Sequence, residues 1–246
     1  MKLYLIRHAQ SANNASYTGT ENHGNRVPDP GITELGHHQS QCLADYLASP
    51  GNEPRQHNLA QFTEPDFRLT HLYCSLMTRS IETALYISQT CSLPLTARDD
   101  LFERKGLYEI NQQGHIQGVS GPNRDYFESR FPRLILPESL GQQGWWNRPA
   151  ENEAEFVSRV ESSLSSILKR HEANHHIALV VHGDYIDQAI NYLMKTPRNT
   201  IRNTSHWEAN WVTHNASITR IDLVDEHANV VYVNHIGHLS TPLLTW

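Results

Sequence analysis

A short apolar run in the second half of the chain constrains the fold more than any other feature. Residues Ile177 to Val181 are consecutively apolar, which is typical of a strand that is covered on both faces within a sheet. Two earlier segments, Leu3 to Ile6 and Leu69 to Cys74, also favour strands. We therefore expect these segments to belong to one sheet that helices cover on both sides.

Helical patterns alternate with these strands along the chain. Apolar residues recur at helical spacing, and Thr33 is a suitable capping residue before the first pattern. The predicted helices run from Thr33 to about Leu47, Thr78 to Thr90, Glu153 to His171 and Gly183 to Met194, with a shorter one near Asp125 to Phe131. Strands that alternate with helices predict a mostly parallel sheet with right-handed connections.

The last part of the chain predicts a different kind of strand pairing. Ser217 to Leu223 and Asn229 to Val233 favour strands, and the link across residues 225–229 is typical of an antiparallel hairpin at a sheet edge. We therefore expect one domain over residues 1–246, folded as a three-layer α/β/α sandwich with an antiparallel edge on a mostly parallel central sheet. Irregular composition predicts insertions near residues 49–68 and 111–150.

Charge and cysteine content limit the classes of partner. The 246 residues carry a formal net charge of −6, so the chain has no overall attraction for nucleic acid or for an anionic membrane. Neither a membrane-spanning apolar stretch nor a signal-peptide pattern is present in the sequence. The three cysteines have no paired spacing, which favours the cytoplasm. Any anion that the protein binds must be held by a few local cations.

Matching polar residues follow three of the predicted strands. Arg7 and His8 end the first strand, Arg79 lies shortly after the second, and His182 with Gly183 follows the apolar run. In open α/β sheets, ligands bind outside the carboxyl ends of the strands. We therefore expect two histidines and two arginines to meet at one rim of the sheet.

This set of residues suits phosphoryl transfer. Arginine forks bind phosphate oxygens through paired hydrogen bonds, and a neutral imidazole can attack phosphorus. The positive charges of Arg7 and Arg79 would lower the pKa of His8 and keep its attacking nitrogen unprotonated. His182 would then donate a hydrogen bond to the phosphoryl oxygens, where charge stabilisation contributes most to catalysis.

At these positions the sequence resembles the histidine phosphatase superfamily, which includes the cofactor-dependent phosphoglycerate mutases. The matching segments follow the family's order along the chain. They are Arg7-His-Ala-Gln-Ser-Ala-Asn-Asn14, Ile32-Thr-Glu-Leu-Gly-His-His-Gln39, Ser75-Leu-Met-Thr-Arg-Ser-Ile-Glu-Thr-Ala84, Leu101-Phe-Glu-Arg-Lys-Gly106, Val180-Val-His-Gly183 and Asn215-Ala-Ser-Ile218. The resemblance spans residues 3 to about 220 and implies a phosphoglycerate mutase-like fold.

The resemblance also implies a role for each matched residue. His8 would carry the phosphoryl group, and Glu103 would act as general acid and then as general base. The implied phosphate-binding residues are Arg7, Asn14, Arg79, His182 and Gly183. Glu109 is a rival for the carboxylate role, but Glu103 holds the motif position. The resemblance implies neither a metal nor another cofactor, and it leaves a homodimer open.

Two departures from the family pattern bear on activity. Ala9 stands where the family usually has glycine, which adds one methyl group and removes no chemistry. Asn13 stands where cofactor-dependent mutases usually have tryptophan, and their basic segment after the glutamate has no counterpart between Gln112 and Arg133. These differences favour hydrolysis of a phosphate monoester over a mutase reaction.

Several residues outside the motifs have two interpretations. The adjacent Trp145 and Trp146 could cover the pocket or pack the insertion against the domain. A set of arginines could form a second anionic subsite or lie in solvent, and a set of late aromatic residues could border the pocket without belonging to the site. These sets are Arg124, Arg130, Arg133 and Arg148, and His206, Trp207 and Trp211.

The sequence predicts a phosphatase that acts on a small phosphorylated substrate, whose identity it leaves open. The alternatives are a phosphoglycerate-type mutase and a non-catalytic protein that binds a phosphorylated ligand. With 16 histidines a zinc hydrolase is a further alternative. The adjacent pairs His37-His38 and His175-His176 lack the i, i+4 spacing of a helical zinc site, which counts against it.

Overall fold

The computed structural model describes residues 1–16, 26–51, 67–195 and 210–246. Most of the insertion predicted near residues 49–68 lies outside this part, and so do His206 and Trp207. The strands are β1 (Lys2–Arg7), β2 (His71–Ser75), β3 (Leu95–Arg98), β4 (Tyr108–Ile110), β5 (Ile116–Gly118), β6 (Leu134–Ile135), β7 (His176–Val181), β8 (Ile218–Val224) and β9 (His227–His235). The helices are α1 (Ala12–Ala15), α2 (Glu34–Ala48), α3 (Thr78–Thr90), α4 (Arg124–Arg130), α5 (Glu153–Lys169) and α6 (Gly183–Leu193), and a 3₁₀ turn spans Thr241–Leu243.

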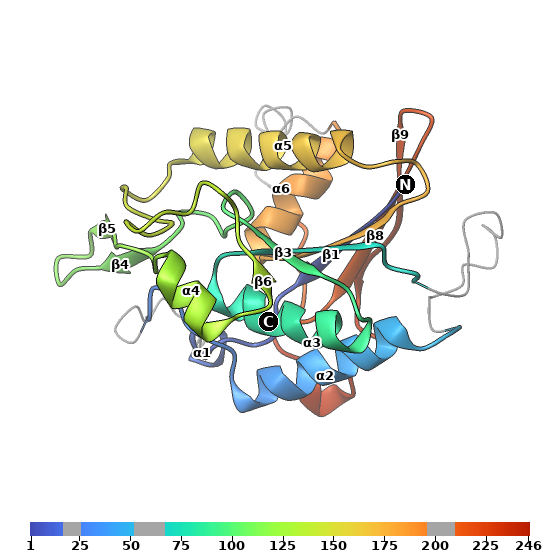
Figure 1. Ribbon diagram of the computed structural model, residues 1–246, viewed down its shortest axis with the longest axis horizontal. Coiled ribbons are helices and arrows are strands. Elements are labelled where there is room, and N and C mark those ends of the chain that lie inside the picture. The colour runs from blue at the N-terminus through green and yellow to red at the C-terminus, as the bar shows by residue number, and fades with distance from the viewer. Residues whose placement is uncertain (17–25, 52–66, 196–209) are drawn as a thin grey trace.

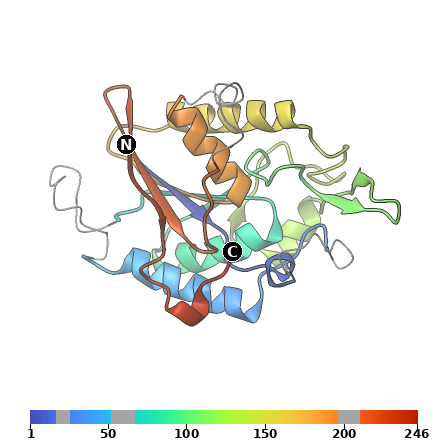
Figure 2. The same ribbon diagram turned by 180° about the vertical axis from the view of Figure 1, so that it is seen from behind.

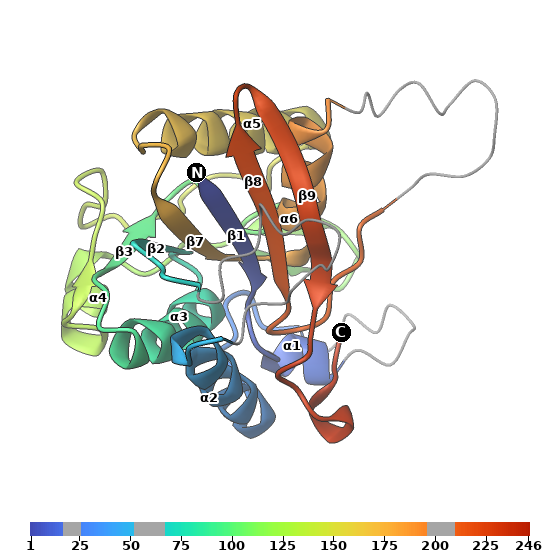
Figure 3. The ribbon, with the colours of Figure 1, turned by 90° about the vertical axis from the view of Figure 1, so that its right-hand side faces the viewer.

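The main sheet has seven strands in the order β6-β3-β2-β7-β1-β8-β9 (Figure 3). The pairs from β6 to β1 are parallel, whereas β8 pairs antiparallel with both β1 and β9. The predicted mostly parallel sheet with an antiparallel edge is therefore confirmed. β7, the predicted central strand, is buried along its whole length between β2 and β1.

Helices cover both faces of this sheet (Figure 1), so the predicted three-layer α/β/α fold is confirmed. α2 and α3 lie on one face, and α5 and α6 lie on the other. Alternate residues of one strand serve the two cores, because successive side chains point to opposite faces. On β1, for example, Tyr4 and Ile6 pack in the core with α2 and α3, while Leu3 and Leu5 pack in the core with α5 and α6.

Side-chain caps explain where two of the helices begin. The Thr33 hydroxyl accepts a hydrogen bond from the Gly36 backbone N–H at 3.1 Å, so α2 begins directly after the predicted capping residue. At the start of α5, Asn152 and Glu155 form a reciprocal capping box. Both helices thereby gain partners for backbone N–H groups that their first turns would otherwise leave unpaired.

The hairpin of β8 and β9 at the sheet edge is longer than the sequence suggests (Figure 2). The sequence indicated a link over residues 225–229, but the turn consists of Asp225 and Glu226 alone. Both residues have positive φ angles, of 48° and 65°. Two-residue hairpin turns of this handedness usually contain Asn or Gly, so an Asp-Glu pair gives little signal in the sequence.

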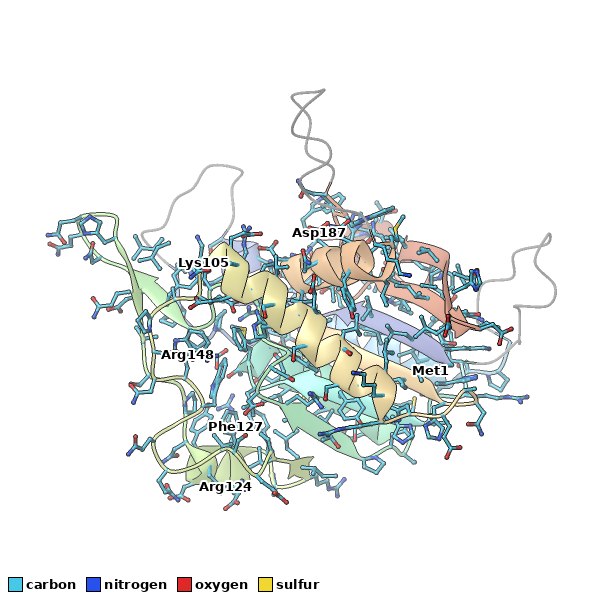
Figure 4. The ribbon with its side chains drawn as sticks, turned by 90° about the horizontal axis from the view of Figure 1, so that it is seen from above. Met1, Lys105, Arg124, Phe127, Arg148 and Asp187 are labelled. Carbon is cyan, nitrogen blue, oxygen red and sulfur yellow. The ribbon has the colours of Figure 1, made fainter. Side chains whose placement is uncertain are left out.

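The predicted insertion at residues 111–150 includes β5, α4 and β6. Phe127 on α4 is buried in the core beside the sheet, whereas Arg124 at the start of this helix binds the insertion's own carbonyls (Figure 4). Trp146 is fully buried and packs against Phe102, Leu107 and Met77. Its ring lies against Gly106, where an added Cβ would collide with it. The tryptophan pair therefore packs the insertion against the domain.

None of the helices in the described part of the chain is long and apolar enough to cross a membrane.

Candidate active site

The carboxyl ends of β1 and β7 bring two of the predicted histidines together. These strands are neighbours in parallel register, with Arg7 opposite Val181. His8 and His182 come one residue later on their strands, and their ring centroids are 5.1 Å apart. Both side chains are buried, at 3% and 0% exposure. The sheet itself thus places the two imidazoles side by side.

The hydrogen bonds of His8 define which nitrogen can react. Its Nδ1–H donates to the carbonyl oxygen of Ala9 at 2.7 Å, so in the neutral ring Nε2 carries the lone pair. Nε2 accepts a hydrogen bond from Nε of Arg79 at 3.1 Å. Burial, followed by the charges of Arg79 and Arg7, holds the pKa of His8 well below its usual range. The ring is therefore neutral near pH 7.

Ala9 fits the position where the family pattern has glycine. Its side chain is fully buried in the core beneath the site. Its backbone N–H donates to the Thr83 hydroxyl at 3.0 Å, and its carbonyl orients His8. The extra methyl group therefore leaves the contacts around His8 in place.

The two arginines have different supports. Arg79 is 7% exposed and lies 4.0 Å from Asp29, which accepts hydrogen bonds from the backbone and hydroxyl of Thr78. The guanidinium of Arg7 donates to the carbonyl oxygen of Thr213, and its buried Nε has no partner among the described residues. A buried donor without a partner is uncommon and is available to an anion. Sequence analysis did not identify Asp29, which lies in an irregular segment without a motif.

His182 is held through one nitrogen and is unpaired at the other. Its Nε2 lies 2.8 Å from the Ser75 hydroxyl, which also accepts a hydrogen bond from the Met77 N–H. Its Nδ1 is buried and has no partner among the described residues. Gly183 begins α6, and an added Cβ there would lie 3.6 Å from Nε of Arg7. This is an ordinary contact distance, and Gly183, predicted to bind phosphate, is not among the residues that line the pocket.

Glu103 enters the site from the loop after β3. Its Oε1 accepts a hydrogen bond from the Arg104 N–H at 2.8 Å, and its Oε2 accepts one from the Asp184 N–H at 3.4 Å. Burial, followed by the charge of Asp184, raises the pKa of Glu103 to about 7. The rival carboxylate, Glu109, is exposed on β4 and does not line the pocket.

The Asn14 side chain is fixed by three donors. Its Oδ1 accepts hydrogen bonds from the backbone and hydroxyl of Ser11 and from Nδ2 of Asn215. The same Asn215 amide donates to the carbonyl oxygen of His8. With Oδ1 engaged in this way, the Nδ2 group of Asn14 is the part of the amide that can serve a ligand.

Most of these side chains surround a pocket of about 190 Å³, whereas His182 lies behind His8 and is not among its lining residues. Its inner wall consists of Arg7, His8 and Arg79, and its outer wall consists of Arg26, Lys105 and Tyr108. The remaining lining residues are Ser11, Asn13, Asn14, Glu103, Arg104 and Asp184. Trp211 and the four arginines considered for a second anionic subsite are not among these lining residues, so they do not contribute to this pocket.

The sequence did not predict the outer wall. The Arg26 guanidinium lies over the Tyr108 ring, 4.0 Å from its centroid, and the Lys105 ammonium is 5.6 Å from the same ring. Asn13 holds this wall in place, because its side chain donates to the carbonyl of Val27 and accepts from the Val27 N–H. In the sequence, Asn13 was distinguished only by its departure from the mutase pattern. In the structure it fixes Val27, the residue that follows Arg26.

Comparison with known proteins gives one family and several relatives. Residues 3–236 match the family model of the histidine phosphatase superfamily, branch 1. A protein of Hydrogenobacter thermophilus, named provisionally as phosphoserine phosphatase 2, is 26% identical over 243 residues, which cover 96% of this chain and 97% of the relative.

Solved structures share the fold at lower sequence identity. A mycobacterial glucosyl-3-phosphoglycerate phosphatase has a TM-score of 0.58 at 16% identity, covering 96% of this chain and 99% of that one. A phosphoserine phosphatase of Entamoeba histolytica, solved with 3-phosphoglyceric acid, has a TM-score of 0.56 at 16% identity, covering 97% and 99%.

Proposed function

This chain belongs to the histidine phosphatase superfamily, and we propose that it hydrolyses phosphate monoesters through a phosphohistidine formed on His8. The observation that carries the proposal is the state of His8. Its Nε2 has a lone pair, contacts Arg79, and lies at the wall of a pocket that also contains Glu103. A nucleophile, a cation and a carboxylic acid thus meet at one small cavity.

In the first step, Nε2 of His8 attacks phosphorus and the bond between phosphorus and the ester oxygen breaks. The leaving oxygen takes the proton of Glu103, which is available because the pKa of this carboxyl is raised to about 7. The products are phospho-His8, the free alcohol and ionised Glu103. Nδ1–H of His8 continues to donate to the Ala9 carbonyl, which orients the ring throughout.

In the second step, ionised Glu103 removes a proton from water as the water oxygen attacks phosphorus. The bond from phosphorus to Nε2 breaks, its electron pair returns to the imidazole, and inorganic phosphate leaves. Glu103 is then protonated again, so the enzyme regains its starting state. One carboxyl group therefore serves as acid and then as base.

Three groups are suited to stabilise the phosphoryl oxygens in both steps. Arg7 and Arg79 supply positive charge and donors, and the buried Nε of Arg7 has no other described partner. The Ser75 hydroxyl accepts a hydrogen bond from the Met77 N–H, so its own O–H can donate to Nε2 of His182. In that arrangement the proton of His182 is on Nδ1, which can donate to a phosphoryl oxygen. Because such donors are already oriented toward the position where negative charge develops, they lower the activation barrier without having to reorient during the reaction.

We extend the proposal to a substrate class: small phosphate esters that also carry a carboxylate. The pocket is small, and Arg7 and Arg79 already supply two positive charges for one phosphate. The cations of the outer wall, Arg26 and Lys105, are therefore available to a second anionic group. The buried Nε of Arg26 has no partner among the described residues. Relatives named for phosphoserine, and one solved with 3-phosphoglyceric acid, support this choice.

Quenching the reaction during turnover of phosphoserine tests the phosphoenzyme. Wild-type protein should retain phosphate that is labile in acid and stable in base, and mass spectrometry should place it on His8. His8→Ala should carry none and lose turnover by roughly 10⁴-fold or more. His115→Ala, at an exposed histidine in the β4–β5 turn, is the matched control. Equal turnover by wild type and His8→Ala would refute the mechanism.

The same assay separates the alternatives. A mutase would yield a phosphate-ester isomer and would depend on a bisphosphate primer, whereas a phosphatase releases inorganic phosphate without one. A protein that only binds the ligand would show neither product.

We also propose a cytoplasmic location, which the free cysteines Cys42, Cys74 and Cys91 support. Cell fractionation tests the location, and light scattering in solution tests the homodimer, which stays a prediction.

A further inference from the structure

Three histidines gather at the end of the sheet opposite the pocket. His71 begins β2, and His171 and His175 lie in the loop between α5 and β7. The carbonyl of His175 accepts a hydrogen bond from the Lys2 N–H, which places this loop beside the start of β1. Figure 4 shows the separation, since Met1 and Lys105 lie at opposite ends of the molecule. The cluster is therefore independent of the proposed function.

The rings are packed closely enough to share one ion. The His71 centroid is 4.3 Å from that of His171 and 4.5 Å from that of His175. One nitrogen from each ring can be chosen so that all three lie within 4.8 Å of one another. The two Nδ1 atoms of His171 and His175 are 3.1 Å apart. Tetrahedral zinc with Zn–N bonds of 2.0–2.1 Å holds its ligands about 3.3 Å apart, which is close to this spacing.

A hydroxyl fixes the tautomer of His71. The Thr70 hydroxyl donates to the carbonyl oxygen of His176 at 3.0 Å, so its single proton is used. Its contact with Nδ1 of His71, at 2.9 Å, must then be a hydrogen bond that Nδ1–H donates. The lone pair of His71 is therefore on Nε2, and Nδ1 has the outer partner that metal-binding histidines usually have.

His171 and His175 can present the other two lone pairs. Nδ1 of His175 accepts a hydrogen bond from the Glu172 N–H at 3.2 Å, so it is unprotonated, and a bound ion would replace this N–H at the same lone pair. Nε2 of His171 lies 3.1 Å from the Tyr73 hydroxyl, which can accept a hydrogen bond from Nε2–H and so leave the lone pair on Nδ1. In the absence of an ion, the proton lies instead between the two Nδ1 atoms. If that proton moves to Nε2 of His171, a cation can bind between the two Nδ1 atoms.

The site is accessible to solvent. All three side chains are half-buried, so a water molecule can complete the coordination.

We propose that His71, His171 and His175 form a site for a late first-row divalent cation, with Zn²⁺ as the ion to test. Imidazole nitrogens suit these ions and do not suit Mg²⁺ or Ca²⁺. The bound ion joins the start of β2 to the loop before β7. Its role is structural, because it binds at the start of β2, whereas Ser75 and His182 lie at the far ends of β2 and β7.

The test uses untagged protein that has been freed of metal. Titration with Zn²⁺ against a chromophoric chelator should show one site per chain, and Mg²⁺ should not compete. His171→Ala should weaken binding by more than the roughly 10–100-fold that loss of an outer partner causes. His175→Ala should do the same, and it lies in a loop where the change spares the core. His115→Ala should bind as tightly as wild type.

A second measurement records the thermal stability of the protein. Zn²⁺ at about 100 times its Kd should raise the Tm of the wild-type protein by about 5–10 °C and leave that of His175→Ala unchanged. The absence of Zn²⁺ binding by wild type overturns the proposal. Equal binding by wild type and either variant also overturns it, since the ion would then lie elsewhere, for example at His8 and His182.

Discussion

The inner and outer walls of the pocket are built in different ways. The inner wall, Arg7, His8 and Arg79, comes from the end of β1 and the first turn of α3, and its groups bind one another or the core. The outer wall, Arg26, Lys105 and Tyr108, comes from irregular segments and a two-stranded sheet. The residues proposed for the chemistry thus lie at the end of a central strand and at the start of a helix, while those proposed to select the substrate lie on more peripheral segments.

After the loss of His8 itself, replacement of Glu103 should have the largest effect. Glu103→Gln removes the proton donor, so kcat for phosphoserine should fall by about 10²–10⁴-fold. With p-nitrophenyl phosphate the leaving group needs no proton, so an initial burst of nitrophenolate should remain while hydrolysis of the phosphoenzyme is slow. Stopped-flow absorbance measures both phases. Glu109→Gln is the matched control, and a comparable loss there would show that the acid has been misassigned.

Replacement of Arg79 tests the inner wall. Arg79→Lys keeps the charge but loses the fork and the Nε donor to His8, so kcat should fall by about 10²–10³-fold for every substrate. The loss should be equal for phosphoserine and glycerol phosphate, since both present the same phosphate. Arg130→Lys, at an exposed arginine paired with Glu82, is the control. A loss confined to phosphoserine would assign Arg79 to substrate selection.

Replacement of Asp184 should change the pH profile. Burial, followed by the charge of Asp184, raises the pKa of Glu103. Because Glu103 must be protonated to act as the proposed acid, activity falls as the pH rises through this pKa. Asp184→Asn lowers the pKa of Glu103 and moves the alkaline limb of kcat/KM to lower pH. The loss at pH 8 should be up to about tenfold, with little change at pH 5.5. Glu153→Gln, which removes the other acidic partner of Arg104, should leave the limb in place.

The smallest effect is expected at the outer wall. Arg26→Ala should raise KM for phosphoserine by about tenfold and leave kcat nearly unchanged, because a charge-assisted contact to the carboxylate is lost. KM for glycerol phosphate, which has no carboxylate, should stay the same. Arg133→Ala is the exposed control. An equal rise in KM for both substrates would assign Arg26 to the phosphate and remove the distinction between the walls.

The sequence predicted the fold and the inner wall because both depend on local patterns. Ile177 to Val181 is apolar throughout, and the charged residues that matter lie within a few positions of strand ends. The outer wall was missed because Arg26 and Tyr108 are 82 positions apart in the sequence and meet only after the loops pack. No periodicity or motif encodes such a contact.

The histidine cluster was missed for a related reason. His171 and His175 have the i, i+4 spacing of a helical zinc pair, but α5 ends before them, so they lie in a loop. The third member, His71, is supplied by a strand that lies 100 positions earlier than His171. Spacing within one segment therefore indicated at most two of the three side chains.

The parallel pairing of β1 and β7 has a consequence for divergence within the family. Adjacent strands in any sheet lie about 4.8 Å apart, and His8 and His182 each follow directly on such a strand. The distance between the two imidazoles is therefore set by the backbone hydrogen bonds between the strands, which do not depend on side-chain identity. Substitutions can accumulate across most of the chain without altering this spacing, and solved structures with the same fold are indeed only 15–18% identical to this chain.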